Sequence, residues 1–267
     1  MPTSETARLT ALYRYPVKGL SPQRMQDVAL DVGKTFPFDR AYAIENGVSG
    51  FDMAAPSYFP KIKFLMLMKQ EKLAELTTSF EDDSHVLTVS RDGKLLVSGC
   101  LQTEQGRADI ENFFGTFCAD EMRGEPKVLH SDEFSFSDVP EKCISIINLQ
   151  SVRDLERKIG KPIDPLRFRG NVYIDDIPAW SEFDWAGKTI QSGAVCLSVF
   201  SRIQRCAATN VDPVTGARDL QIPNSLIEHY GHRDCGVYAT VQTAGRLAEG
   251  QRLELSEARS GADAQAF

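Results

Sequence analysis

Several features that would indicate a membrane or secreted protein are missing from this chain of 267 residues. No apolar run approaches the roughly 20 residues that a membrane-spanning helix needs, and the densest apolar stretch, residues 64–68, has the length of a strand. The first residues are polar and contain no apolar segment of the kind found in signal peptides. We therefore expect a cytoplasmic protein that does not contact a membrane.

The cysteines lack the spacing of a metal cluster or a dithiol motif. No C-x-x-C occurs, which argues against an iron–sulfur cluster and against a thioredoxin-like pair. In a chain of this length, scattered thiols indicate a reducing compartment, and most of them are expected to be small buried hydrophobic residues. At most one or two should be chemically active. The six cysteines are Cys100, Cys118, Cys143, Cys196, Cys206 and Cys235.

The chain also lacks an excess of positive charge and the common nucleotide-binding motifs. Its formal net charge is −7, so no overall positive field attracts nucleic acid or an anionic membrane. Neither a P-loop nor a G-x-G-x-x-G after a predicted strand occurs. With 42% apolar and 25% charged residues, the composition is that of a globular protein. We expect its partner to be a small-molecule substrate and not a nucleic acid.

Short stretches of alternating apolar residues dominate the first third of the sequence. Residues 85–90 and 94–98 flank Arg91-Asp92-Gly93, which predicts a β-hairpin because glycine provides the positive φ that the tight turn needs. This part of the chain is expected to form a compact β module, either a small barrel or a curled sheet. Its other predicted strands are residues 9–15, 25–30 and 41–45.

The rest of the chain combines a few helices with more strands and shows no regular alternation of the two. Apolar residues at helical spacing predict helices at 108–118 and 151–159, and Gly160 is expected to end the second one. The polar residues 125–140 predict a loop between the two halves. We therefore predict a mostly β fold with some α, containing a barrel. The later predicted strands are residues 144–148, 171–174, 189–191, 195–199 and 236–243, the last pairing with 252–255.

One stretch of the second half concentrates groups that could carry out chemistry. Residues 205–216 read Arg-Cys-Ala-Ala-Thr-Asn-Val-Asp-Pro-Val-Thr-Gly. An arginine stands beside Cys206, a hydroxyl follows three residues later, and the Asp-Pro-x-Thr-Gly turn can rigidify the loop. A neighbouring cation favours the thiolate form, which binds soft metals or attacks electrophiles. From position alone, the alternative is an inert core cysteine beside a solvated arginine.

This stretch and three other motifs resemble those of a known family. The motif at 205–216, preceded by Arg-Phe-Arg-Gly-Asn at 167–171, resembles the core signature of MOSC domains, which are named for the C-terminal domain of molybdenum cofactor sulfurases. Tyr-Pro-Val-Lys-Gly at 15–19 and Asp-Arg at 39–40 resemble the N-terminal β-barrel extension of the family that includes the mitochondrial amidoxime reducing component. The motifs occur in the family's order and span most of the chain.

The resemblance implies a domain organisation and a cofactor. We expect an N-terminal β-barrel-like domain at 8–100, a MOSC-type β-barrel domain at 108–256 and a frayed tail at 257–267. The cofactor implied is molybdenum bound to molybdopterin, with the thiolate of Cys206 as the metal ligand and the catalytic group. Basic side chains suit the phosphate of the pterin. The residues expected to bind the cofactor are Lys18, Arg40, Asn148, Ser151, Arg169, Asn171, Arg205, Thr209 and Asp212.

Two positions depart from the family's pattern. Gly19 stands where many relatives have serine, so a hydroxyl contact is missing there. Gly170 replaces a common proline, which loosens the backbone without removing a ligand. We expect no fused iron–sulfur domain, no domain for pyridoxal phosphate and no N-terminal membrane anchor of the kind that some relatives have. We therefore expect no iron–sulfur cluster, no pyridoxal phosphate, and electrons that come from a separate donor protein.

By this resemblance we predict a molybdenum cofactor-dependent oxidoreductase that reduces N-hydroxylated or N-oxygenated small molecules. One alternative is a cofactor-binding or sulfur-carrier protein, with a persulfide on Cys206 and no substrate turnover. Another is a metal-free enzyme that uses Cys206 as a nucleophile. The last alternative requires a histidine near the sulfur.

A second group of possible ligands occurs near the C-terminal end. His229-x-x-His232-x-x-Cys235 has a spacing that could present two imidazoles and a thiol to zinc. No fourth ligand is evident nearby in the sequence. We therefore interpret the segment as a polar surface loop with solvated histidines.

The remaining aromatic and acidic clusters favour structural roles. Trp180, Phe183 and Trp185 are interpreted as core or loop anchors and not as a platform for stacking on a ligand. The acidic residues at 175–176 and 81–83 flank predicted turns, so we interpret them as solvated charges and not as acid–base catalysts.

Overall fold

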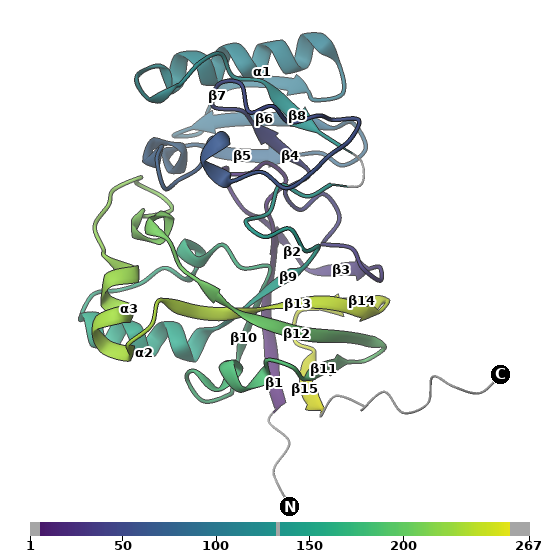
Figure 1. Cartoon of the computed structure of the whole chain (residues 1–267), viewed down its shortest axis with the longest axis vertical. Helices are drawn as coiled ribbons and strands as arrows, with labels where there is room; N and C mark the ends of the chain where they lie inside the picture. The colour runs from purple at the N-terminus through teal and green to yellow at the C-terminus, as the bar shows by residue number, and fades with distance from the viewer. Residues whose placement is uncertain (1–5, 132–133, 257–267) are drawn as a thin grey trace, which may run out of the picture.

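A closed barrel of seven strands forms the larger lobe of the protein (Figure 1). The computed structural model describes residues 6–131 and 134–256, and the predicted tail at 257–267 lies outside them. Neighbouring strands follow the order β10-β9-β13-β12-β11-β15-β1, and antiparallel pairing of β1 with β10 closes the ring. The strands are β1 (Thr6–Arg14), β9 (Ile144–Asn148), β10 (Val172–Asp175), β11 (Thr189–Ser192), β12 (Val195–Gln204), β13 (Asp234–Thr243) and β15 (Arg252–Ser256).

Alternating apolar residues fill the inside of this barrel. Successive side chains of a strand point to opposite faces, so Ala7 and Leu9 of β1 are fully buried while Arg8 between them is exposed. The ring joins the first described strand of the chain to strands that begin more than a hundred residues later. The larger core therefore contains side chains from both ends of the chain, among them Leu12, Ile146, Val172, Ile174, Leu197, Val237, Val241 and Leu253.

The smaller lobe lies above the barrel in Figure 1 and consists of short strands and one helix. Its β6–β7 hairpin turns at Asp92 and Gly93, whose φ values of 52° and 75° fit a type I′ turn. The predicted hairpin is confirmed. One antiparallel sheet contains β5 (Thr77–Phe80), β6 (Val86–Arg91) and β7 (Lys94–Cys100), and a second pairs β4 (Tyr42–Ile44) with β8 (Val128–His130).

Helix α1 (Glu104–Phe117) covers the smaller lobe. It begins earlier than predicted because the hydroxyl of Thr103 caps it, accepting a hydrogen bond from the N–H of Gly106. A Cβ on Gly99 would overlap the backbone of Gly106, so the helix rests directly on β7. The predicted start of the second domain at residue 108 falls inside this helix, which packs in one core with the strands of the smaller lobe.

Helix α2 (Leu149–Ile159) lies against the outside of the barrel. The side chain of Asn148 caps it, and Gly160 ends it with a φ of 70°, as the sequence predicted for this position. Val152 and Leu155 are buried in the core that α2 shares with the outer face of the barrel. The short β9–α2 connection therefore fixes Asn148 deep in the protein.

Three expectations for the fold are wrong. Helix α3 (Ile222–Tyr230) includes His229, for which we expected a loop, although Pro223 at its start and Gly231 after its end are typical helix boundaries. The expected loop at 125–140 contains β8, which pairs with β4. Strand β13 does not pair with β15, because β14 (Gly245–Ala248) leaves the barrel between them to pair with β3 (Asp27–Leu30).

Short elements complete the structure. Strand β2 extends the sheet beside β1, outside the closed ring. Within the part of the chain that the structure describes, no helix has the length and apolar character needed to cross a membrane. The mostly β fold with some α and a barrel is confirmed. The remaining elements are β2 (Gln23–Met25), β3 (Asp27–Leu30) and the 3-10 helices η1 (Lys61–Lys63), η2 (Glu71–Glu75), η3 (Ala119–Glu121), η4 (Pro165–Phe168), η5 (Ser181–Trp185) and η6 (Ala207–Asn210).

Candidate functional site

A cavity of about 520 Å³ lies where the two lobes meet. Its wall combines residues of the first half, such as Lys18 and Lys61, with residues of the barrel, such as Ser145 and Tyr238. The lining is rich in basic side chains although the net charge of the chain is −7. Most of the predicted site residues meet here, namely Lys18, Arg40, Arg169, Asn171, Arg205, Cys206 and Thr209.

Cys206 stands between the end of β12 and the start of η6, half-buried in the cavity wall. The hydroxyl of Thr209 donates a hydrogen bond of 2.9 Å to the carbonyl oxygen of Cys206, which holds the first turn of η6. The ammonium nitrogen of Lys61 lies 3.3 Å from the sulfur. The cation in contact with the thiol therefore comes from η1 of the smaller lobe and was not predicted.

Arg205, the neighbour of Cys206 in sequence, has a structural role: it binds the backbone of two other segments. Its side chain is buried and donates hydrogen bonds to two backbone carbonyls, at 2.9 Å to Phe168 and 2.8 Å to Cys235. These bonds connect η4 and β13 below the cavity. The guanidinium thus stabilises the wall that carries the thiol.

Asp138 connects two of the cavity's ammonium groups. Its carboxylate accepts hydrogen bonds from Lys18 at 2.6 Å and from Lys61 at 2.7 Å, and Lys18 also donates to the carbonyl oxygen of Phe136 at 2.7 Å. Burial alone would raise the pKa of Asp138, but the two ammonium groups hold it well below its usual range. Burial opposes the charge of Lys61, yet Asp138 and the Cys206 thiolate raise the pKa of this lysine. Burial lowers the pKa of Lys18, and Asp138 opposes this effect, so the carboxylate favours the charged form of both lysines.

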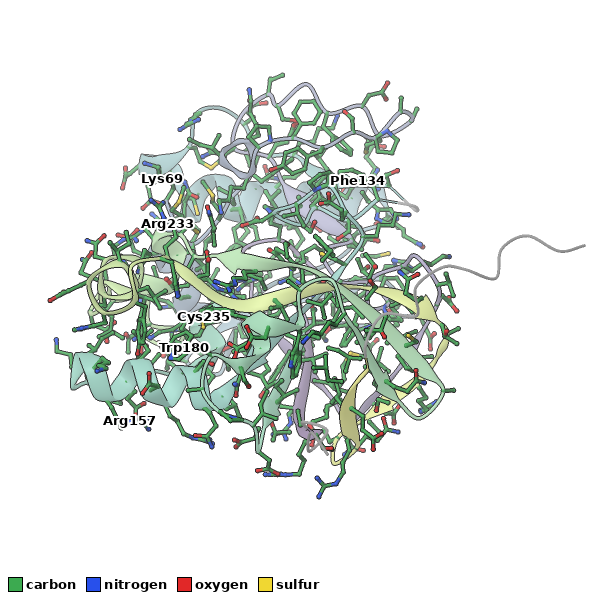
Figure 2. The ribbon with its side chains drawn as sticks, turned by 60° about the horizontal axis from the view of Figure 1, so that its bottom comes forward. Lys69, Phe134, Arg157, Trp180, Arg233 and Cys235 are labelled. Atoms are coloured by element: carbon green, nitrogen blue, oxygen red, sulfur yellow. The ribbon has the colours of Figure 1, made fainter. Side chains whose placement is uncertain are left out.

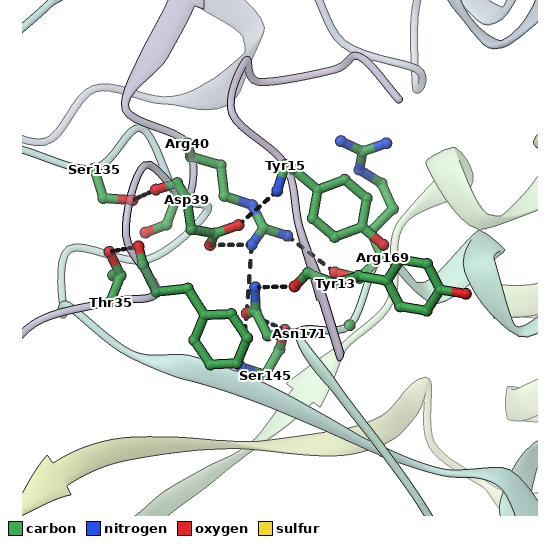
Figure 3. A network of polar contacts seen from close by, with 12 residues as sticks. Tyr13, Tyr15, Thr35, Asp39, Arg40, Ser135, Ser145, Arg169 and Asn171 are labelled. Carbon is green, nitrogen blue, oxygen red and sulfur yellow. Dashed lines mark hydrogen bonds and ion pairs between the residues drawn. The ribbon is translucent and has the colours of Figure 1, made fainter. Parts of the chain in front are cut away.

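Asn171 is the centre of a network on the barrel side of the cavity (Figure 3). Its side-chain oxygen accepts hydrogen bonds from the hydroxyl of Ser145 at 2.8 Å and, more weakly, from Arg40 at 3.4 Å. Arg40 pairs with Asp39 and donates at 2.9 Å to the carbonyl oxygen of Arg169. Burial disfavours the charge of Arg40, but Asp39 raises its pKa above the usual value. These contacts fix Arg40 and Asn171 side by side.

Asp212 organises the loop that follows the thiol and does not line the cavity. One carboxylate oxygen accepts hydrogen bonds from the backbone and the hydroxyl of Thr215, at 2.8 and 2.9 Å, and the other accepts one from Arg167 at 3.0 Å. Arg167 also pairs with Asp219, and its Nε is buried without a partner among the described residues. The Asp-Pro-x-Thr-Gly turn thus rigidifies the loop, as expected, while Asp212 itself contacts protein groups.

Asn148 and Ser151 are the other predicted residues outside the cavity lining. Both are fully buried and bind Glu182, at 2.9 Å from the Asn148 amide and 2.8 Å from the Ser151 hydroxyl. Burial raises the pKa of Glu182, while these two hydrogen bonds act in the opposite direction. The short connection from β9 into α2 points both side chains at this carboxyl group instead of at the cavity.

The possible zinc ligands do not assemble. Cys235 is fully buried on β13, where Figure 2 labels it, and the Nδ1 of His232 accepts a hydrogen bond from the N–H of Asp234. Among the residues that the structure describes, no group of three His, Cys, Asp or Glu side chains could hold a metal. The imidazole required by a Cys206 nucleophile is also missing, since no histidine of residues 6–131 or 134–256 lines the cavity.

The aromatic cluster anchors the loop beside α2, as expected. Trp185 is buried in the barrel core and Phe183 packs with it. Trp180 donates a hydrogen bond of 2.8 Å from its indole N–H to Asp154 on α2. The interpretation of residues 175–176 as solvated charges is wrong for Asp175, which is buried and pairs with Arg153.

Some cavity residues could not be found by the sequence analysis. Lys61 and Asp138 belong to no motif that we recognised, and residues 125–140 were interpreted only as a loop. Tyr15 does not line the cavity but packs against two arginines that do, Arg40 and Arg169, and it was assigned no role although it belongs to a recognised motif. What joins these residues is their approach in space, for which a single sequence carries no local signal.

Two family profiles match the chain in succession. Residues 6–121 match the profile described as the MOSC N-terminal beta barrel domain, and residues 131–254 match the MOSC domain. The chain carries both MOSC domains. The predicted Cys206 and the cationic residues Arg169 and Arg205 lie in the MOSC domain, whereas Lys18, Arg40 and Lys61 lie in the N-terminal one. The cavity therefore forms at the junction of the two.

One curated relative is the mitochondrial amidoxime-reducing component 1 of Danio rerio. It is 28% identical over 135 residues, which are 48% of this chain and 40% of the relative. This chain therefore matches less than half of that protein's length. Among solved structures, the YUAD protein from Bacillus subtilis is 14% identical with a TM-score of 0.46, covering 96% of this chain and 99% of that one. YiiM from Geobacillus stearothermophilus is 19% identical with a TM-score of 0.35, covering 45% and 56%.

The cavity has the donors that a phosphate-bearing metal cofactor requires. The buried Nε of Arg167 has no partner among the described atoms, and the side chain of Arg169 makes no hydrogen bond or ion pair within the described chain. Guanidinium donors without a partner in the described chain, one of them fully buried and one partly buried, favour an anion. A thiol in the same wall is a soft ligand for a metal such as molybdenum. The residues present therefore fit molybdopterin in charge and in ligand type.

Proposed function

We propose that the chain binds molybdenum as a molybdopterin complex in this cavity, with the thiolate of Cys206 as the protein ligand, and that it is an oxidoreductase. The observation that carries the proposal is the contact of Lys61 with the sulfur of Cys206 in a cavity lined by basic residues, at the junction of two MOSC domains. The positive side chains match an anionic cofactor, and the sulfur is a soft ligand for molybdenum.

Several residues of the chain would hold the cofactor. Arg40, Arg169 and Lys18 would bind its phosphate and its anionic groups, since guanidinium and ammonium groups form charge-assisted hydrogen bonds with them. Asn171, fixed by Ser145, would donate to or accept from the pterin ring. Arg205, Thr209 and Asp212 would keep the backbone around the ligand rigid through the contacts described above. Asn148 and Ser151 act with Glu182 and have no role in this proposal.

The reaction proposed is the reduction of an N-hydroxylated small molecule. The name of the Danio rerio relative describes the reduction of amidoximes, which contain an N–OH group. In this reaction the N–O bond breaks, two electrons and two protons enter, and the amine or amidine and water leave. The bound cofactor would supply the two-electron redox chemistry. The electrons would come from a separate donor protein.

The chain's own side chains would place a positive charge beside the metal ligand. Lys61 lies beside the sulfur and Asp138 fixes its position, so a positive charge stays next to the ligand. No histidine of the described chain lines the cavity, and the mechanism requires no imidazole base because the protons can come from water. A sulfur-carrier role for Cys206 would use the same thiol but no electron donor and no N-hydroxylated substrate.

Substrate turnover tests this proposal. The protein is expressed in a host that makes the cofactor, and benzamidoxime reduction is measured with reduced methyl viologen as the electron source. The expected result is one benzamidine for every two electrons consumed, abolished in Cys206→Ser and kept in Cys196→Ser, which alters a half-exposed cysteine outside the cavity lining. Metal-loaded protein that consumes no electrons with any N-hydroxylated substrate would favour the carrier role.

A further inference from the structure

Tyr15 follows β1 and separates two of the cavity's arginines. Its side chain is fully buried. The guanidinium carbon of Arg40 lies 4.6 Å from the centre of the ring, and that of Arg169 lies 4.2 Å from it. Figure 3 shows the ring of Tyr15 between the side chains of Arg40 and Arg169. Two cations from different lobes thus share one aromatic ring.

The backbones of both arginines have an unusual conformation. Arg40 has a φ of 51° and Arg169 a φ of 50°, values that residues other than glycine seldom adopt. The surrounding chain enforces them, because the N–H of Arg40 donates to the carbonyl of Tyr15 at 2.8 Å and the N–H of Arg169 donates to that of Leu166 at 3.0 Å. At Arg169 this conformation also ends η4, and at both positions it sets the direction in which the side chain leaves the backbone.

The charge balance of this group is incomplete. Asp39 is the one carboxylate among the described residues that pairs with either guanidinium, and it pairs with Arg40. Arg169 has the ring of Tyr15 as its recorded partner and makes no hydrogen bond or ion pair within residues 6–131 and 134–256. Burial and the charge of Arg40 lower the pKa of Arg169, although Tyr15 opposes this effect. Two guanidiniums with one carboxylate leave a net positive charge at the cavity wall.

An aromatic ring can reduce the cost of bringing these cations together. The faces of the ring carry negative partial charge, so each guanidinium is attracted to one face. The ring also blocks other rotamers of both side chains, because it is buried and immobile. Without the ring, Arg169 would lose its aromatic partner and turn away from the like charge of Arg40, which Asp39 and the carbonyl of Arg169 still hold.

We propose that Tyr15 is a positioning residue whose ring holds Arg40 and Arg169 as one rigid anion site that binds a phosphate group. This inference deepens the proposed function, since the phosphate of the pterin is the anion expected in the cavity. In this proposal the cation–π contacts of the Tyr15 ring hold the two arginines, and the tyrosine hydroxyl is not required. The inference concerns phosphate binding alone and holds whether or not the chain turns over a substrate.

The test uses the metal-free protein and inorganic phosphate. Binding is measured by titration calorimetry at low ionic strength for the wild type, Tyr15→Phe and Tyr15→Leu. Phenylalanine keeps both ring faces, so we expect an affinity within about twofold of the wild type. Leucine fills similar apolar space without a π system, and we expect about tenfold weaker binding, as for the loss of a buried cation–π contact. Tyr13→Leu, two residues earlier on β1, is the matched control and should bind phosphate normally, because Tyr13 packs on Tyr173.

A second variant separates the ring's electrostatics from its shape. Pentafluorophenylalanine at position 15 keeps the ring's shape but reverses the polarity of its faces, so it should weaken phosphate binding about as much as leucine while the melting temperature without phosphate stays near that of Tyr15→Phe. Wild-type affinity in Tyr15→Leu or in the fluorinated protein would overturn the inference, as would an equal loss in Tyr15→Phe. Absence of molybdenum from the wild type would count against the proposed function and leave this phosphate measurement intact.

Discussion

The ammonium nitrogen of Lys61 and the sulfur of Cys206 lie 3.3 Å apart although 145 residues separate them in the chain. Lys61 belongs to η1 of the smaller lobe, and Cys206 lies two residues after Gln204, the last residue of the barrel's β12. Asp138 accepts a hydrogen bond from Lys61 and another from Lys18. The packing of the smaller lobe on the barrel therefore brings charged side chains, first of all Lys61, next to the thiol.

Replacing Lys61 is expected to weaken cofactor retention without abolishing it. Lys61→Met removes the positive charge beside the thiolate and frees Asp138 to face an anionic ligand. A partly buried ion pair is worth roughly 1 kcal/mol, so we expect molybdenum occupancy at limiting cofactor to fall about five-fold. Lys63→Met, at the other end of the same η1, is the control and should keep wild-type occupancy. Equal metal content in both variants would contradict a role for Lys61.

Replacing Arg205 is expected to destabilise the fold. Arg205→Lys loses the fork that reaches the carbonyls of Phe168 and Cys235 together. Leaving one buried carbonyl without a donor costs about 1–3 kcal/mol, which is the expected loss in the free energy of unfolding measured with urea. Arg233→Lys changes an exposed side chain and should alter this free energy by less than about 0.5 kcal/mol. Similar values for the two variants would show that the fork of Arg205 is dispensable.

The family's common proline at position 170 does not fit this chain. A Cβ on Gly170 would overlap Cγ1 of Ile147. Gly170→Ala is therefore expected to lower the free energy of unfolding by about 1–3 kcal/mol, the usual cost of overpacking a core. In an Ile147→Ala background the same change should cost much less, since Cγ1 is gone. A double-mutant cycle with urea unfolding measures the coupling, and equal costs in both backgrounds would show that the contact is not the reason for the glycine.

Glu182 predicts a pH dependence of stability. Burial raises its pKa above the ordinary value of 4.5, so the folded state favours the protonated acid. This contribution to stability is present below the pKa of the unfolded chain and is lost as the pH rises through the pKa of the folded protein. A glutamine at position 182 does not titrate. The difference in free energy of unfolding, Glu182→Gln minus wild type, should therefore increase from pH 4 towards neutral pH, with a slope of at most that for one proton. A difference that is flat over this range would contradict a raised pKa.

Local features of the fold were predictable because their causes are local. The hairpin at Asp92 and Gly93 follows from turn residues whose positive φ values the structure contains. The end of α2 at Gly160 has the same kind of cause. The pairing of β13 was not predictable in this way, since its neighbours β9 and β12 are chosen by closure of the whole barrel and not by the short connection to β14.

The residues of the candidate site likewise include some that sequence motifs predict and others that only the tertiary fold brings together. Motif residues such as Arg40, Asn171 and Cys206 line one cavity, as their shared family pattern implied. Lys61 and Asp138 reach it through tertiary folding, and no spacing in the sequence places them beside the thiol. Asn148 and Ser151 were assigned to the cofactor from sequence, but the buried carboxyl of Glu182 takes their hydrogen bonds. Which of several polar side chains meets a cavity depends on packing that a single sequence does not reveal.

The central claim is that Cys206 ligates molybdenum, and metal and pterin content tests it most directly. Molybdenum is measured by elemental analysis and pterin by fluorescence after oxidation, in the wild type, Cys206→Ser and Cys196→Ser purified from one cofactor-producing host. We expect near-stoichiometric metal and pterin in the wild type and in Cys196→Ser, with metal lost from Cys206→Ser. A correctly folded wild-type protein that contains neither, or a Cys206→Ser variant that keeps its full molybdenum content, would contradict the account.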